Sequence, residues 1–424
     1  MKREHGSPRH DRSVRRNFLA FTLNGLFFPG AGRILEAGLL LTWFVTQLSE
    51  ATWLIGLIVP IQYGLALVAQ PWIGQYLSGT RRRAPWYAGQ ALVRAGLWCG
   101  LGVATGLADE QRGLLLWLFF TIVLLDAVLA GVGNIAFSDT LARVIPEKLR
   151  GRTRGWRGAS GAVTSALVGV VMTRLTSPDR DLSIFVWLFA GAGILYGLGG
   201  LTFVAINEPA ETHAPEPLAL QPVFREMWRR DAFRRFVWIQ VLTVPAIHVL
   251  PFLTLLGKQR HSIELDALGL MIIADGVAPL SANLLWGRLA DRRSNQWVIR
   301  CATLTAVVTP SLAAVLSGRN AALSHAGVVM IFTALVFVAR AAQVGIDLGT
   351  KNYILDLAPD AERRPLYIGV NDTLIAIPTI ALISSGAVVD ALGFATLFVG
   401  TAAAGAFACA LSTRLTSANA HENE

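Results

Sequence analysis

The chain has 424 residues, of which 53% are hydrophobic and only 15% charged, and its mean hydropathy is +0.50. A soluble protein of this composition would lack the polar side chains needed to cover its surface, so the composition predicts a membrane protein. The formal net charge of +9 does not indicate a nucleic-acid partner, because the Lys and Arg residues lie in short loops between apolar stretches.

The three cysteines, Cys99, Cys301 and Cys409, lie far apart inside apolar runs, with no histidine at ligand spacing. This pattern argues against a disulfide framework and predicts no metal site. No nucleotide-binding motif occurs, so we expect no cofactor and no direct use of ATP. We also expect no enzyme activity, because no nucleophile and base cluster together.

Twelve apolar stretches are long enough to cross a bilayer, which takes about 17 to 25 residues. They are Phe18–Thr46, Thr52–Leu77, Ala84–Leu107, Leu114–Phe137, Gly158–Leu175, Leu182–Ile206, Phe236–Leu256, Leu268–Leu289, Val298–Leu316, Leu323–Leu348, Tyr367–Val389 and Gly393–Ser412. The predicted domains are an N-terminal tail that stays attached (1–17), a six-helix bundle (18–206), a linker (207–235), a second six-helix bundle (236–412) and a C-terminal tail (413–424).

The linker ends in a basic segment in which Phe224 and Trp228 are four residues apart, with Arg225, Arg229 and Arg230 beside them. This spacing predicts a helix lying on the cytoplasmic membrane surface. With a cytoplasmic N-terminus, 28 of the 37 Lys and Arg residues fall on the cytoplasmic side, six on the other and three inside helices. We therefore expect a bacterial-type inner membrane protein with both termini in the cytoplasm.

The two halves of the chain repeat each other at one offset. Four sites recur 213 residues further on: Gly56 as Gly269, Gly74 as Gly287, Pro146 as Pro359, and Arg150 as Arg363. One spacing kept at four sites predicts two parallel six-helix repeats.

The loop after the eighth predicted helix reads GRLADRRSN, from Gly287 to Asn295, and it resembles the signature G-x-L-x-D-R-x-G-R-R of the major facilitator superfamily. The resemblance implies an all-α membrane protein of twelve helices, arranged as two six-helix repeats around a central cavity. The fifth predicted helix lacks the proline that drug antiporters of the superfamily carry, so the subfamily stays open.

The same resemblance implies a gating role for Gly74, Gly287, Asp291 and Arg292. Glycine lets helix ends approach, and the acid and the arginine can pair with an adjacent helix end. The first half has Ser78 in place of the acid. We therefore expect a latch that acts mainly through the second half, against the alternative that these charges only set topology.

Charges inside the predicted helices point to the mechanism, since an ionisable side chain at mid-bilayer costs roughly 2.5 to 3.5 kcal/mol without a partner. Helices 1, 4, 7 and 10 line the cavity in this superfamily, and here they contain Arg33, Glu36, Asp126, His248, Arg340 and Asp347. Position 126 maps by the repeat to Ala339, so Asp126 and Arg340 are expected to face one another. Asp275 and Asp372 are secondary candidates, and Arg94 is expected to be a structural partner.

Arginine keeps its charge, so Arg33 and Arg340 suit a polar or anionic substrate group, with Asn24, Gln343 and Asp347 as further substrate-binding candidates. The candidates for proton coupling are Glu36, Asp126 and His248, because these side chains can titrate. Two plainer readings stay open. Arg33 and Glu36 can simply neutralise each other, and His248 can bond a carbonyl freed by a kink between Pro245 and Pro251.

The sequence thus predicts a secondary active transporter that moves a small polar or anionic solute by alternating access, coupled to protons. We expect it to act as a monomer in the lipid bilayer. One alternative is proton-driven efflux of hydrophobic or cationic compounds, attracted by Asp126 and Glu36. A second alternative is a non-transporting membrane sensor on the same scaffold.

Overall fold

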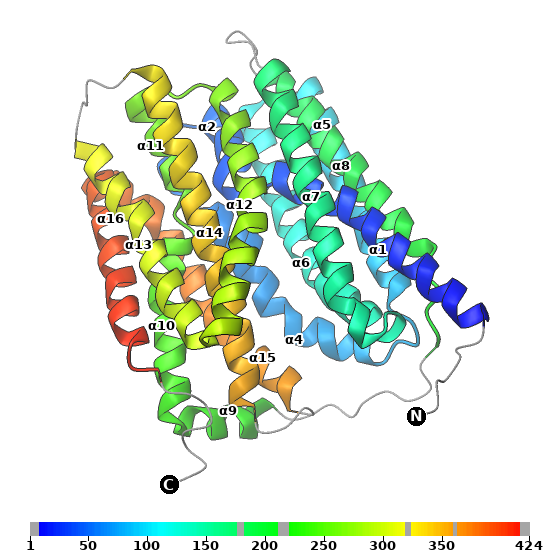
Figure 1. The fold of residues 1–424 in the computed structure, drawn as a ribbon. Helices are drawn as coiled ribbons and strands as arrows, with labels where there is room; N and C mark the ends of the chain where they lie inside the picture. The colour runs from blue at the N-terminus through cyan, green and yellow to red at the C-terminus, as the bar shows by residue number, and fades with distance from the viewer. Residues whose placement is uncertain (1–7, 176–181, 211–219, 319–323, 359–362, 416–424) are drawn as a thin grey trace. The chain divides into compact units, whose positions relative to one another are not determined.

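The computed structural model describes residues 8–175, 182–210, 220–318, 324–358 and 363–415, and every regular element in these ranges is a helix (Figure 1). The first half contains α1 Pro8–Ile34, the π-helix η1 Ala37–Leu41, α2 Thr42–Leu48, α3 Thr52–Val59, the π-helix η2 Pro60–Gly64, α4 Leu65–Ser78, α5 Ala84–Leu107, α6 Arg112–Val144, α7 Glu147–Leu175 and α8 Ser183–Val204. The second half contains α9 Leu220–Arg229, α10 Asp231–Ile247, α11 Leu250–His261, α12 Leu265–Arg292, α13 Asn295–Gly318, α14 His325–Leu357, α15 Arg364–Ala381, the 3-10 helix η3 Leu382–Ser384 and α16 Ser385–Ser412.

Nine segments of the described chain are long and apolar enough to cross a membrane. Two further predicted spans coincide with α5 and α7, and the long segment Leu366–Ser412 contains the last two predicted spans. Gly393, where the last of these was expected to begin, has a non-helical backbone with φ 82° inside α16. The chain is therefore an all-helical, multi-pass membrane protein, and the count of twelve spans fits it but stays a prediction.

Helix ends confirm the internal repeat. Helices α6 and α14 are Arg112–Val144 and His325–Leu357, so their first and last residues are each 213 apart (325 − 112 and 357 − 144). Helices α3 and α12 begin at Thr52 and Leu265, which is the same offset. Equivalent stretches of the two halves therefore fold in the same way.

The described residues group into two compact units. The first unit contains residues 8–35, 69–168 and 182–210, and the second contains 36–68, 169–175 and the described residues from 220 onward. The segments 36–68 and 169–175 of the first half thus group with the second half. The bundle boundaries proposed from the sequence stay a prediction.

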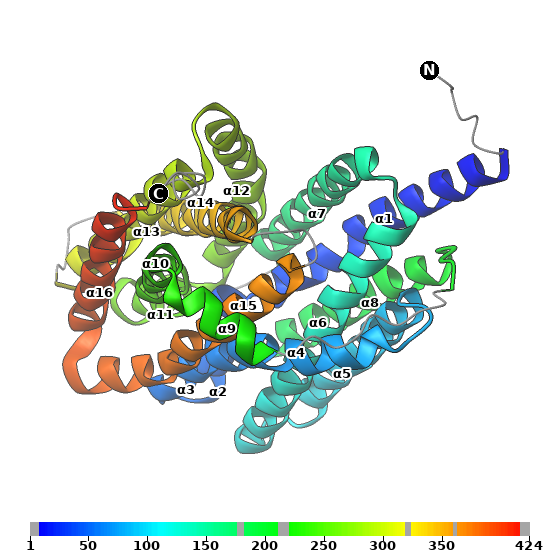
Figure 2. The same ribbon diagram turned by 90° about the horizontal axis from the view of Figure 1, so that it is seen from below.

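Glycines set the close packing inside each unit. In the first unit, a Cβ on Gly193 of α8 would lie 2.7 Å from the carbonyl oxygen of Ala95 on α5, so only glycine permits this crossing. In the second unit, the repeated glycines Gly56 and Gly269 both lie at such crossings. A Cβ on Gly56 would lie 2.9 Å from the amide nitrogen of Gly386, and a Cβ on Gly269 would lie 2.6 Å from the carbonyl oxygen of Gly169. In Figure 2, α13 lies between α14 and α16 within this unit.

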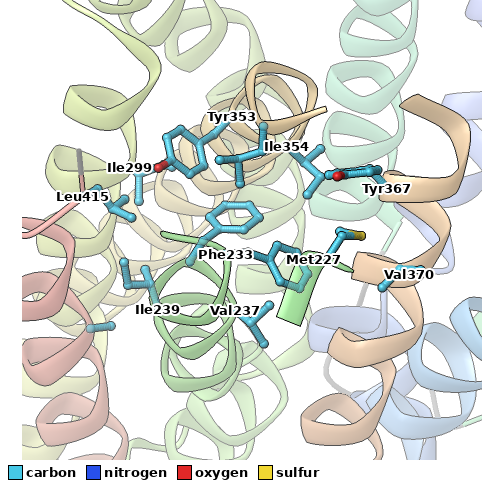
Figure 3. Packing of buried hydrophobic residues seen from close by; sticks show 13 residues of the cluster. Met227, Phe233, Val237, Ile239, Ile299, Tyr353, Ile354, Tyr367, Val370 and Leu415 are labelled. Atoms are coloured by element: carbon cyan, nitrogen blue, oxygen red, sulfur yellow. The ribbon is translucent and has the colours of Figure 1, made fainter. Parts of the chain in front are cut away.

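Helix α9, predicted from the linker, lies across the ends of α10 and α15 (Figure 1). Met227 of α9 is fully buried in a cluster with Phe233 of α10 and Tyr367 of α15, which Figure 3 shows from close by. The predicted helix is therefore present, and its inward side is fixed by packing.

The first and seventh predicted spans are interrupted at equivalent positions of the repeat. Helix α10 ends at Ile247 and α11 begins at Leu250, which confirms the kink expected between Pro245 and Pro251. The first predicted span lies within one candidate span, Ser13–Leu48, but its helix is interrupted, because α1 ends at Ile34, which is 213 residues before Ile247. Each interruption places a polar side chain, Glu36 or His248, at the break.

Candidate functional site

Arg340 of α14 lies at the centre of a buried polar cluster in the second unit. Its Nη2 lies 2.9 Å from Oε2 of Glu36, and its Nε donates a hydrogen bond to Oδ1 of Asp275 on α12. A third contact runs from Nη1 to Oε1 of Gln343 at 2.6 Å. Only 6% of Arg340, 7% of Glu36 and 1% of Asp275 is exposed, so the cluster is shielded from solvent. Three elements therefore converge on one guanidinium group.

Glu36 reaches this cluster because the helix is broken there. The residue has extended backbone angles, φ −72° and ψ 126°, and it caps the π-helix η1. Its backbone carbonyl accepts bonds from the amides of Leu39 and Leu41, at 3.2 and 3.4 Å. These bonds satisfy the first turn of η1, so the carboxylate remains available for side-chain partners.

Tyr63 gives Glu36 a second partner. The Tyr63 hydroxyl donates to Oε1 of Glu36 at 3.1 Å, and Tyr63 lies in the π-helix η2, which begins at Pro60. Single π-turns inside helices occur frequently at functional sites. The ring of His248 lies against that of Tyr63, with centroids 5.3 Å apart. His248 also lines a hollow inside this unit, together with Ile55, Pro245 and Thr401.

Two buried carboxylates of this cluster lie against one guanidinium group. Glu36 and Asp275 each contact Arg340, from different elements of the fold. Within the described residues no group of three His, Cys, Asp or Glu side chains could hold a metal ion.

A second buried pair, in the first unit, is balanced. Asp126 of α6 accepts two bonds from Arg94 of α5, at 2.7 and 2.9 Å, and a third from Trp98 Nε1 at 2.7 Å. Arg94 also donates to the Tyr196 hydroxyl at 2.6 Å, and its guanidinium lies 4.0 Å from the centroid of that ring. One positive and one negative charge with these partners form a neutral group, which suits a structural role.

The expected pairing of Asp126 with Arg340 joins two different units and stays a prediction. Within its own unit, Asp126 is paired with Arg94, and Arg340 is paired with Glu36 and Asp275. The sequence did not predict these partners as the main contacts. Glu36 contacts Arg340, and the plainer reading in which Arg33 and Glu36 neutralise each other stays a prediction.

The other substrate-binding candidates lie in different surroundings. Asn24 is fully buried, and its side chain joins four helices of the first unit through Tyr87, Arg157 and the carbonyl of Gly199, at 3.2, 3.1 and 2.9 Å. Arg33 is half-buried in the last turn of α1, and Asp347 is exposed on α14. Their roles, and that of Gln343, stay predictions.

The gating candidates of the second half, which were expected to form the main latch, make few contacts in the structure. Asp291 and Arg292 are exposed at the end of α12, and neither makes an ion pair with another described residue. No described atom lies within 4 Å of where a Cβ of Gly287 would be, and Gly74 meets only a side-chain carbon of Ile135 at 3.8 Å. These residues therefore do not form a closed latch in this structure, and their gating role stays a prediction.

The first half, which lacks the motif's acid, instead contains a buried polar network. Glu208 Oε2 accepts bonds from the amides of Arg83 and Ala84 at the start of α5, both at 2.7 Å. The Arg83 side chain, only 1% exposed, lies 3.5 Å from Asp139, and Arg143 lies 3.6 Å from Glu208. In the first half, a carboxylate from the start of the linker, Glu208, thus contacts the end of the loop whose acidic motif position is Ser78.

Sequence reasoning missed two contributors to these sites. Nothing in the sequence around Tyr63 indicated a functional role, apart from Pro60 three residues earlier. Glu208 lies in a polar stretch that was predicted to be part of the linker. Asp275 was only a secondary candidate, although a carboxylate inside an apolar run was the signal that could have raised it.

Comparison with known proteins supports the class that the fold defines. Residues 245–424 match the sequence model of the Major Facilitator Superfamily. A solved D-xylose-proton symporter has a TM-score of 0.71 with 17% identity, covering 96% of this chain and 99% of that one. A solved nucleoside transporter has a TM-score of 0.71 with 12% identity, covering 94% of this chain and 100% of that one. A bacterial homologue of the iron transporter ferroportin has a TM-score of 0.67 with 14% identity, covering 95% of this chain and 99% of that one.

Curated relatives match a shorter part of the chain. Uncharacterized proteins of Mycobacterium tuberculosis and Mycobacterium bovis are 22% identical over 202 residues, which covers 45% of this chain. The matched chain spans about a third (36%) of those relatives' length. The family match covers residues 245–424, and the solved structures share the helical fold of nearly the whole chain.

Proposed function

We propose that this protein is a proton-coupled secondary transporter, and that the cluster of Arg340, Glu36 and Asp275 is its coupling site. The single observation that supports this role is that two buried carboxylates, Glu36 and Asp275, both contact the one buried guanidinium group of Arg340. A proton bound by either carboxylate changes its attraction to Arg340, so proton binding is coupled to the contacts of the site. The first solved structure named above, a symporter of protons and a sugar, has the same fold.

Within this proposal Glu36 is the proton carrier and Arg340 is its fixed counter-charge. Glu36 lies at a helix break, where its side chain can change partners with little cost to helix hydrogen bonding. Asp275 is the more buried of the two acids and accepts a bond from Arg340 Nε. His248 and Tyr63 lie next to the carrier and suit a path for its proton.

The substrate in this proposal is a small polar or anionic solute. Protonation of Glu36 weakens its hold on Arg340, and the freed guanidinium donors then suit a carboxylate or hydroxyl of the solute. Arg33, Asn24, Gln343 and Asp347 are candidates for its remaining contacts. The protein acts as a monomer in a bacterial-type inner membrane, with both termini cytoplasmic.

A second candidate function is proton-driven efflux of cationic compounds, and the same excess of carboxylates favours it. In that case a cationic substrate, rather than a proton alone, neutralises Glu36 and Asp275. The two functions differ in ligand charge, so a panel of ligands separates them.

Thermal unfolding of the purified protein with sugars, nucleosides, short peptides, organic acids and cationic dyes should identify the ligand class. A ligand at 100 times its Kd stabilises the folded state by about 2.7 kcal/mol, which raises Tm measurably. We expect a polar or anionic ligand to give the largest rise. Uptake of that ligand into proteoliposomes should then increase with an imposed pH gradient and fall when a protonophore is added. Uptake that ignores both treatments would contradict proton coupling.

A further inference from the structure

Only one face of helix α9 packs against the rest of the described second unit. Met227 is buried among residues of α10 and α15 (Figure 3). Glu226 accepts bonds from Arg230 and Arg363, both at 3.0 Å, and from the Tyr367 hydroxyl at 3.2 Å. This carboxylate therefore neutralises arginines on the fastened side and fixes the rotation of the helix.

The other side of α9 carries positive charge that no described acid neutralises. Arg225 and Arg229 are exposed and four residues apart, so they lie on one face. No ion pair joins either arginine to an acidic residue of the described chain, whereas Arg230 and Arg234 nearby both have such partners. The fold thus leaves two adjacent guanidinium groups open on this face.

Aromatic side chains border the charged face. Phe224 and Trp228 stack with ring centroids 5.7 Å apart and an interplanar angle of 20°, and Phe224 is 37% exposed. At 100° per residue, this pair lies between the buried side of Met227 and the side of Arg225 and Arg229. Aromatic rings next to cationic side chains are typical of helices that lie at the level of lipid headgroups.

The position of α9 fits that level. Helices α10 and α15 both belong to predicted membrane spans, and α9 crosses their ends rather than running along them (Figure 1). A helix across the ends of spanning helices lies along the membrane surface, where phosphate groups are abundant.

We propose that the face of α9 formed by Arg225, Arg229, Phe224 and Trp228 binds the headgroups of anionic phospholipids in the leaflet that it faces. The two guanidinium groups bind the phosphates, since arginine donors match phosphate oxygens in pairs. Phe224 and the edge of Trp228 contact the first carbons of the acyl chains. This site is independent of the transport function proposed above.

The test is lipid binding to the purified full-length protein in neutral detergent, titrated with phosphatidylglycerol or phosphatidylcholine and followed by native mass spectrometry. The variant is Arg225→Gln with Arg229→Gln. Each arginine near an anionic surface contributes about 1 kcal/mol, so the double variant should bind phosphatidylglycerol roughly 30-fold more weakly. Phosphatidylcholine should bind weakly to both proteins.

The matched control is Arg81→Gln with Arg82→Gln, which removes two exposed charges from a loop of the first unit. It should keep wild-type binding. Equal loss in the control, or unchanged binding in the α9 variant, would overturn the proposal. An excess of inorganic phosphate that displaces the lipid fully would also overturn it, because the site would then bind free phosphate. Size-exclusion profiles and Tm of each variant establish that it is folded.

Discussion

Two buried arginines in this protein differ in the number of carboxylates that they contact, and we propose that this difference separates a structural pair from a coupling site. Arg94 contacts one carboxylate, with Trp98 and Tyr196 completing the bonding of the pair. Arg340 contacts two carboxylates, Glu36 and Asp275. A neutral pair is stable without any ligand, whereas a second carboxylate beside one guanidinium group provides a place for a proton.

A structural Asp126 makes a testable prediction. Asp126→Asn leaves Arg94 charged and unpaired in a buried site, which should destabilise the protein by about 3 to 5 kcal/mol and lower its Tm and expression. Adding Arg94→Gln removes the remaining charge while amide groups keep hydrogen bonds to Trp98 and Tyr196. The double variant should therefore recover most of the Tm and retain proteoliposome uptake. Recovered stability without uptake would instead support Asp126 as a proton carrier, as the sequence predicted.

Local chemistry explains which site residues could be predicted. Glu36, Asp126 and Arg340 stand out because a charge in an apolar run is costly wherever it lies in the fold. Their partners could not be predicted, because pairing depends on distances between helices that are remote in sequence. Tyr63 illustrates the limit, since its hydroxyl acts on Glu36 only because η2 turns it toward the broken first span.

At the scale of the elements, α5 depends on a residue outside itself. Its N-cap residue, Arg83, provides no side-chain cap, and Glu208 supplies the acceptor for the first two amides from 125 and 124 residues away. A carboxylate at a helix N-terminus also interacts favourably with the helix dipole. The start of the linker is therefore tied to α5.

Glu208→Ala should lower the Tm of the protein, because loss of a capping acceptor typically costs about 0.5 to 2 kcal/mol. Thermal unfolding in detergent measures this change. The matched control is Glu264→Ala at the N-cap of α12, where the glutamate is exposed and makes no cap bond. An equal, small shift in both variants would show that Glu208 contributes nothing through capping.

Most helices could be predicted, but only one of the two main interruptions could. The lengths of the apolar stretches defined the spans. The repeat at an offset of 213 residues predicted that α6 and α14 begin and end at equivalent positions, which they do. The kink near His248 followed from two prolines. The break at Glu36 has no proline or glycine at the break itself, since the nearest proline, Pro29, lies within α1. Tertiary contacts must hold it open, and Thr254 of α11 bonds the carbonyl of Gly38 at 2.5 Å.

At the scale of the whole molecule, the chain is a multi-pass membrane protein with the fold of solved secondary transporters, and its residues 245–424 match the Major Facilitator Superfamily. Transport itself is our proposal, and it depends on whether the buried cluster exchanges a proton with each cycle. Glu36 is the residue on which this depends most, because it lies at a helix break and has alternative partners in Arg340 and Tyr63.

The most direct test compares gradient-driven accumulation with exchange in proteoliposomes containing wild-type protein, Glu36→Gln or the exposed control Glu110→Gln. A gradient of one pH unit supplies about 1.4 kcal/mol, so one-to-one coupling should let wild type and the control accumulate the solute up to roughly tenfold. Glu36→Gln removes the titrating group, so it should exchange labelled for unlabelled solute without accumulating it. Accumulation by Glu36→Gln equal to that of wild type would contradict the proposed coupling site.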